Sequence, residues 1–215
     1  MKPWLVTLLC TLACVNAWAD DDLRPLKAWA PKGWRLIKQA SGDLNGDGIK
    51  DAAVIFEDTD PANIKKNDRM GSEQLNTNPR KLIVLLGEQG LFKRVAESDS
   101  LVPPENTEVS PCLADPLSDL TINKGTLRLQ LTEWLSCGGW SVTTTSYTYR
   151  FDGSGLRLIG EDESSFMRNS GEKSITSTNY LTGKRKITTG LNEFEKSRPQ
   201  TTWENIGPQE PQYLN

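Results

Sequence analysis

The chain has 215 residues, of which 36% are hydrophobic, and a formal net charge of −3 without any histidine. The lack of histidine excludes Ser-His-Asp and Cys-His nucleophilic sites and any zinc site with imidazole ligands. Mild acidity without a basic cluster argues against a nucleic-acid partner.

Residues 1–19 have the three parts of a secretory signal: a positive start, an apolar stretch of about twelve residues and a small-x-small cleavage site ending at Ala19. Such a stretch is too short to cross the ~30 Å hydrocarbon core as a helix. No later run is longer, so we expect no membrane span. The expected location is the periplasm of a Gram-negative bacterium, or the exterior, after cleavage following Ala19. Lipidation at Cys14 is the alternative.

The region after the signal starts polar and then turns to β patterns. Residues 20–32 predict one short turn of helix at most, and 34–37 favours a strand over a helix. After the loop 43–51, residues 52–56 form a short, continuously apolar run, which is typical of a buried central strand.

Residues 43–51 fit D-x-N-x-D-G-x-x-D, a pattern typical of calcium-binding loops. Alternate residues at positions 1, 3 and 5 turn side-chain oxygens inward, and the glycine at position 6 permits a sharp turn. Position 7 contributes a carbonyl, and position 9 binds directly or through water. The predicted ligands are Asp43, Asn45, Asp47, the carbonyl of Ile49, and Asp51.

The loop departs from an EF-hand at position 12, where Val54 replaces the bidentate Glu. The missing ligand predicts weak binding, with a Kd of about 10⁻⁴–10⁻³ M as in extracellular modules. We expect the ion to be structural, because one site beside a buried strand mainly stabilises the turn. The alternative is an Asx- and glycine-rich β-turn without a metal.

The polar segment 58–80 lies between two apolar runs and is far longer than the usual ~4–6 residue connection. It predicts a long loop that is either functional or poorly ordered. Within it, Asp60 followed by Pro61 is suited to the cap and first position of one helical turn.

The remainder predicts strands separated by Gly-, Asn- and Asp-rich turns, with Tyr147, Tyr149 and Phe151 on one face. We therefore predict a mainly β protein with little helix: one antiparallel β domain of hairpins over 20–215, either blade-like or a sandwich. The predicted strands are 82–86, 91–96, 120–122, 127–131, 147–151, 156–159, 174–180, 184–189 and an edge strand around Trp203.

Two cysteines follow the signal, Cys112 and Cys137. In an oxidising compartment such a pair predicts one disulfide. The two are not in a Cys-x-x-Cys spacing, which leaves little support for a reactive pair.

Four segments together resemble a group of exported bacterial proteins of unknown function that carry one FG-GAP-like calcium loop before a β-rich body. The resemblance implies the β fold and the calcium ligands between Asp43 and Asp51, and it implies no activity. Because the loop occurs once, a complete propeller is not expected. The segments are 31–34, 40–48, 76–80 and 179–184.

For function, the main hypothesis is a calcium-stabilised module that binds an envelope protein or a glycan, expected to be a monomer. Trp134 and Trp140 flank Cys137-Gly-Gly139, where small residues leave aromatic faces open; otherwise core packing is the default for tryptophan. An inhibitor or immunity-type protein is one alternative.

The other alternative is a histidine-free polysaccharide hydrolase with an Asp/Glu pair, for which Glu133 beside Trp134 is the candidate acid. Two short motifs predict only turns. Ser170-Gly-Glu-Lys173 lacks the partner motifs of penicillin-interacting serines. Thr182-Gly-Lys184 lacks the upstream glycine of a phosphate loop.

Overall fold

The structure, a computed structural model, describes residues 24–215, so the predicted signal at 1–19, with Ala19 and Cys14, lies outside the described residues. Within 24–215, no helix is long and apolar enough to cross a membrane. The helical elements are α1 (Arg24–Lys27) and the 3₁₀ turn η1 (Pro61–Asn63). The strands are β1 (Trp34–Gly42), β2 (Asp51–Asp58), β3 (Ile64–Lys66), β4 (Gln74–Asn76), β5 (Arg80–Glu88), β6 (Leu91–Ser98), β7 (Leu117–Asn123), β8 (Thr126–Trp134), β9 (Ser141–Phe151), β10 (Leu156–Met167), β11 (Glu172–Asn179), β12 (Lys184–Asn192) and β13 (Gln200–Asn205).

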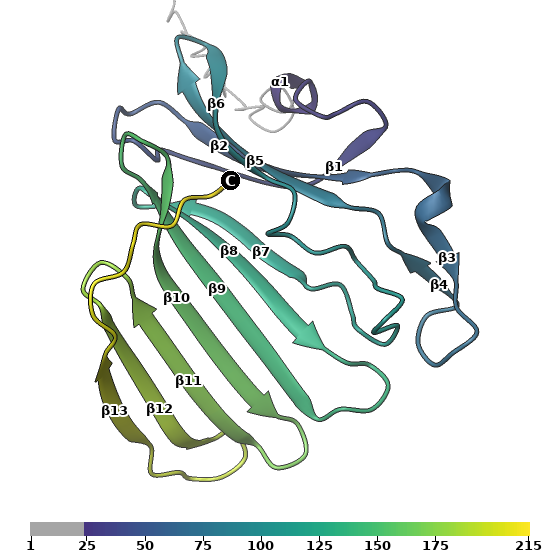
Figure 1. The fold of residues 1–215 in the computed structure, drawn as a ribbon, viewed down its shortest axis with the longest axis vertical. Helices are drawn as coiled ribbons and strands as arrows, with labels where there is room; N and C mark the ends of the chain where they lie inside the picture. Colours follow the sequence, from purple (N-terminus) through teal and green to yellow (C-terminus); the bar gives the residue numbers. More distant parts are fainter. Residues whose placement is uncertain (1–23) are drawn as a thin grey trace, which may run out of the picture.

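Two antiparallel sheets make up most of the molecule (Figure 1). The smaller sheet has the strand order β1-β2-β5-β6, and the larger is a seven-stranded meander in the order β13 to β7. The prediction of a mainly β protein built from antiparallel hairpins is confirmed. Each predicted strand lies inside an observed one, except that 174–180 extends one residue past the end of β11. The single turn of helix expected within 20–32 is α1.

The main core lies between the two sheets. β2 contributes Ala53 and Ile55 from one face, and β8 contributes Leu127 and Leu129. From β9, Tyr149 is buried in the same core, and Tyr147 and Phe151 pack against it, as their alternation predicts.

A second core lies on the opposite face of the smaller sheet. It contains Val54 and Phe56 of β2, covered by Leu26 of α1 and by the partly buried Trp29 and Trp34. Both faces of β2 are therefore buried, which explains why its sequence is continuously apolar rather than alternating.

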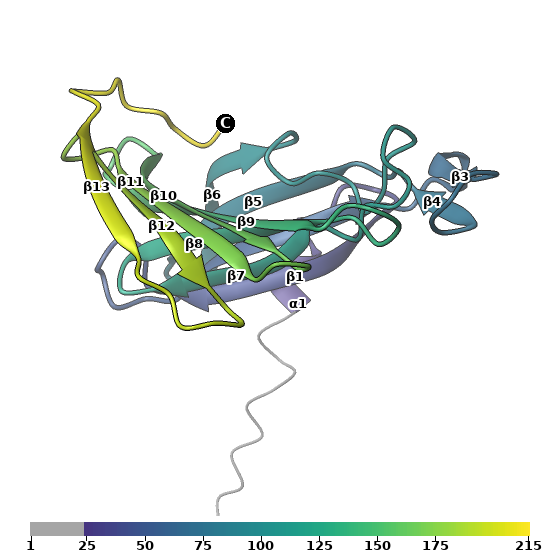
Figure 2. The ribbon, with the colours of Figure 1, turned by 90° about the horizontal axis from the view of Figure 1, so that it is seen from below.

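The larger sheet extends beyond the smaller one. Figure 1 shows β11 to β13 fanning away from β1, β2, β5 and β6, and Figure 2 shows β13 at the outer end of the meander. All six residues of β13 are exposed. These outer strands rely on main-chain pairing more than on a core.

The segment 58–80 is ordered rather than a plain loop. It contains η1, whose cap Asp60 accepts a hydrogen bond from the Ala62 N–H (2.8 Å), and the hairpin β3–β4. The helical turn is confirmed. The description of the whole segment as loop is wrong, because Leu75, only 2% exposed, gives β4 a buried anchor.

Candidate functional site

The loop 43–51 joins β1 to β2 and is held by its own side chains. The carboxylate of Asp43 accepts hydrogen bonds from the Gly46 N–H (2.7 Å) and the Gly48 N–H (2.9 Å). Both glycines have φ of 81°, a left-handed conformation that side chains disfavour. Asn45 accepts from the Asp47 N–H (3.1 Å). Backbone donors lower the pKa of Asp43, with Gly48 and then Gly46 as the leading causes.

Asp51 has a different place from the other predicted ligands. Its side chain is fully buried, and it accepts hydrogen bonds from the Leu44 N–H (2.6 Å) and the Gly87 N–H (2.9 Å). Burial raises the pKa of Asp51, and the negative charges of Asp47 and Asp43 add to the rise. Asp51 therefore anchors the loop to the end of β5.

The fit of this loop to a cation rests on its oxygen donors. Asp43, Asn45 and Asp47 are near the surface and supply side-chain oxygens, the ligand type that calcium prefers. Among residues 24–215, however, no three acidic or cysteine side chains lie together in a group that could hold a metal ion. The predicted ligand set stays a prediction, and both carboxylate oxygens of Asp51 accept main-chain hydrogen bonds.

The predicted disulfide is present. Cys112 and Cys137 are bonded, with their Cα atoms 5.4 Å apart. The bridge joins segment 112–116, which precedes β7, to the turn between β8 and β9. Two main-chain hydrogen bonds continue this attachment, from Ser136 to Cys112 (2.7 Å) and from Ala114 to Trp134 (2.9 Å).

Beside the disulfide lies an exposed apolar surface, which we call the tryptophan patch: Trp134, Leu135 and Trp140. Their exposed fractions are 43%, 38% and 59%. Arg168, which follows β10, lies with its guanidinium 5.6 Å from the ring centroid of Trp134. It also donates hydrogen bonds to the carbonyls of Leu135 (3.1 Å) and Gly139 (2.6 Å), which ties the patch to a third strand.

The tryptophans therefore divide into two groups. Core packing is confirmed for Trp29 and Trp34, which pack against the second core. Trp134, Trp140 and Trp203 are instead exposed. The sequence indicated the patch through the two glycines next to Cys137, but not Arg168, whose 34-residue separation from Trp134 matches no local pattern.

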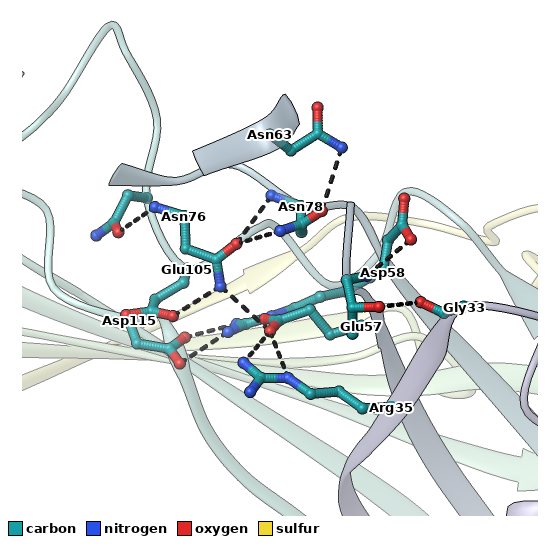
Figure 3. Close-up of polar contacts among 12 residues, drawn as sticks. Gly33, Arg35, Glu57, Asp58, Asn63, Asn76, Asn78, Glu105 and Asp115 are labelled. Atoms are coloured by element: carbon teal, nitrogen blue, oxygen red, sulfur yellow. Dashed lines mark hydrogen bonds and ion pairs between the residues drawn. The ribbon is translucent and has the colours of Figure 1, made fainter. Parts of the chain in front are cut away.

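A buried ion network contacts segment 112–116, which also carries the disulfide (Figure 3). Glu57, 1% exposed, accepts hydrogen bonds from Nε of Arg80 (2.9 Å) and Nε of Arg35 (3.1 Å). Arg80 also makes two parallel hydrogen bonds to Asp115, of 2.6 and 2.9 Å. Asn76 adds a hydrogen bond to Glu57 (3.2 Å). The network joins β1, β2 and β5 to segment 112–116.

The network lowers the pKa of two carboxyl groups, those of Glu57 and Asp115. Burial raises the pKa of Glu57, but the hydrogen bonds from Arg35 and Arg80 outweigh it and hold the pKa below its ordinary value. The same balance, with Arg80 as the opposing cause, lowers the pKa of Asp115. Both carboxylates are therefore ionised at neutral pH, and the network is a structural support rather than a proton-transfer site.

The enzymatic candidates gain no support from their surroundings. Glu133 is exposed, so it lacks the apolar enclosure that a general acid needs. Lys173 pairs with Glu193 (2.5 Å), while the Ser170 hydroxyl accepts a hydrogen bond from the Glu172 N–H (3.3 Å). Gly183 lies in the turn between β11 and β12.

Comparison with protein-family models, with curated proteins and with solved structures finds no match to this chain. Its function is therefore inferred from its own residues and their geometry.

Proposed function

We propose that this chain is an exported β protein that acts by binding a glycan of the bacterial envelope, and that calcium at 43–51 stabilises it. The tryptophan patch is the observation that carries the binding role. Large aromatic side chains exposed together are uncommon on a protein without a partner, and they mark interaction sites.

The patch has a rigid support, which a binding surface requires. Arg168 holds Trp134 from one side, and the disulfide holds the turn that carries Trp140. Indole rings offer flat apolar faces to the C–H face of a sugar ring, and nearby polar groups can bond its hydroxyls. This chemistry favours a glycan over a purely apolar partner.

The calcium proposal has a separate basis. Asp43, Asp47 and Asp51 repel one another across a short loop, as the raised pKa of Asp51 reflects after the effect of burial. A cation bound by the outer oxygens would relieve this repulsion. The structural consequence is a firmer connection between β1 and β2.

Calcium should raise the melting temperature of the mature protein relative to excess EDTA. At one hundred times Kd, binding to the native state alone adds about 2.7 kcal/mol, or a rise of about 5–10 °C for a domain of this size. Asp47→Ala should remove the rise, whereas Asp68→Ala, on an exposed residue outside the loop, should keep it. An unchanged melting temperature across the titration would reduce 43–51 to a metal-free turn.

Binding is tested by co-sedimentation with purified peptidoglycan sacculi. Trp134→Ala and Trp140→Ala should each weaken binding by about thirtyfold, since loss of an aromatic anchor costs about 2 kcal/mol. Leu91→Ala is the control, because Leu91 is 76% exposed but lies on β6. Equal binding by all four proteins, or none by the wild type, would rule out this patch as a peptidoglycan site.

A further inference from the structure

The outer edge of the larger sheet is formed by β13. This strand pairs with β12 on one side, and its six residues are all exposed. In both ribbon views β13 is the last strand of the meander, and no other strand within residues 24–215 pairs with its outer side (Figures 1 and 2).

The direction of its backbone groups follows from one hydrogen bond. The Ile206 N–H donates to the Gly183 carbonyl (2.8 Å), which continues the register that pairs Lys184 with Asn205. Residues of an antiparallel strand alternate in the side to which they bond. Thr201, Trp203 and Asn205 therefore turn their N–H and C=O groups toward the free edge.

The other edge strands of the two large sheets, β1, β6 and β7, are protected. β1 and β7 lie against each other, and Lys38 donates to the Ser118 carbonyl (2.5 Å) across that junction. β6 carries the exposed cations Lys93 and Arg94, and its pairing with β5 contains a register shift. Basic residues and bulges are common protections of an edge strand against pairing.

β13 has neither protection. It contains no lysine or arginine, and its register with β12 runs without a shift from Gln200 to Asn205. Trp203, 66% exposed, lies at its middle. The edge is a ready template for another strand.

We propose that β13 pairs antiparallel with β13 of a second copy of this chain, which makes the protein a weak homodimer with one continuous sheet. A two-fold axis through Trp203 places Trp203 opposite the partner's Trp203, and Thr201 opposite the partner's Asn205. All three outward residues then exchange main-chain hydrogen bonds, six in total by the antiparallel pattern. This proposal replaces the expectation of a monomer, and it does not depend on calcium or on the tryptophan patch.

The sequence of β13 selects this register. A shift of two residues in one direction sets Glu204 opposite the partner's Glu204, and like charges directly opposite are destabilising. A shift in the other direction sets Asn205 opposite the partner's Pro199, which has no N–H to donate. A strand of another protein would also fit the edge, but β13 of a second copy offers a hydrogen-bond partner to every outward N–H and C=O group.

The dimer is expected to be weak. Six hydrogen bonds and one aromatic pair are fewer than the ~10 hydrogen bonds of a standard interface of ~1,600 Å². The expected Kd is therefore micromolar to millimolar.

The test is analytical ultracentrifugation of the mature chain from about 10 μM to 1 mM, the range that this affinity implies. We expect the average mass to rise from monomer toward dimer. Trp203→Lys opposes two like charges and should hold the protein as a monomer. Thr201→Pro should do the same, because it removes an outward N–H that β12 does not use.

Leu91→Lys is the matched control, since it adds the same charge at an apolar residue of β6 that is 76% exposed, against 66% for Trp203, and should leave the dimer intact. Circular dichroism and thermal melting establish that each variant is folded. A wild type that stays monomeric throughout overturns the proposal. The proposal is also overturned if both Trp203→Lys and Thr201→Pro still form the dimer, or if Trp134→Lys is the only one of the three substitutions that disrupts it.

Discussion

Arg80→Met should lower the free energy of unfolding by about 3–5 kcal/mol at pH 7, because it leaves Glu57 buried with one fewer cation. Arg80 and Glu57 are 2% and 1% exposed, so water does not compensate either charge. Urea unfolding followed by tryptophan fluorescence measures the loss. Two further hydrogen bonds, from Arg80 to Asp115, disappear with the guanidinium.

The loss should depend on pH in a defined direction. Because the pKa of Glu57 is held below its ordinary value of 4.5, the wild-type network contributes full stability above about pH 4.5. That contribution disappears as the pH falls through the lower folded-state pKa. Without the hydrogen bond and charge of Arg80, the pKa of Glu57 should rise, so the folded variant should take up a proton at a higher pH than the wild type. The difference between wild type and Arg80→Met should therefore shrink from pH 7 to pH 4.

Two further substitutions test whether the loss of stability comes from the burial of Arg80 or only from the loss of one positive charge. Lys66→Met removes an ion pair with Asp68 in which both side chains are about four-fifths exposed, and should change stability by at most about 1 kcal/mol. Arg80→Lys keeps the charge but loses the paired hydrogen bonds to Asp115, and should fall between the other two. Equal losses for Arg80→Met and Lys66→Met would show that the network is not a buried support.

Local patterns predicted most of the strands because each pattern reflects burial on known faces. The run 52–56 is apolar throughout since β2 lies between two cores. The alternation in β8 follows from one buried face, where Leu127 and Leu129 are fully buried. The division into two sheets had no such signal, because it depends on which strands pair across long separations.

The polar segments were the least predictable part for the same reason. The hairpin β3–β4 is held by contacts such as the Asn76 N–H to the Asn106 side chain (2.9 Å), thirty residues apart. Nothing within 58–80 indicates that partner. Likewise, the glycines near Cys137 predicted open aromatic faces, but the supports of the patch, Arg168 and the network at Arg80, come from distant strands.

Cys112→Ser with Cys137→Ser should lower the free energy of unfolding by about 3–4 kcal/mol in the chain-entropy description of a loop with a sequence separation of 25. The wild type in excess reductant should show the same loss in urea unfolding. A double variant as stable as the oxidised wild type would mean that segment 112–116 is held without the bridge.

The same double variant also distinguishes residues that hold the tryptophan patch in place from residues that contact the glycan. Segment 112–116 is held by the disulfide and by Arg80 through Asp115, and it bonds to Trp134 through Ala114. Releasing one attachment should therefore weaken binding to sacculi although both indoles remain. Trp140→Ala should weaken binding to sacculi as much as the double variant does. It should leave the free energy of unfolding nearly unchanged, because Trp140 is 59% exposed. Loss of stability without loss of binding in the double variant would show that the patch keeps its geometry without the disulfide, with Arg168 as its sufficient support.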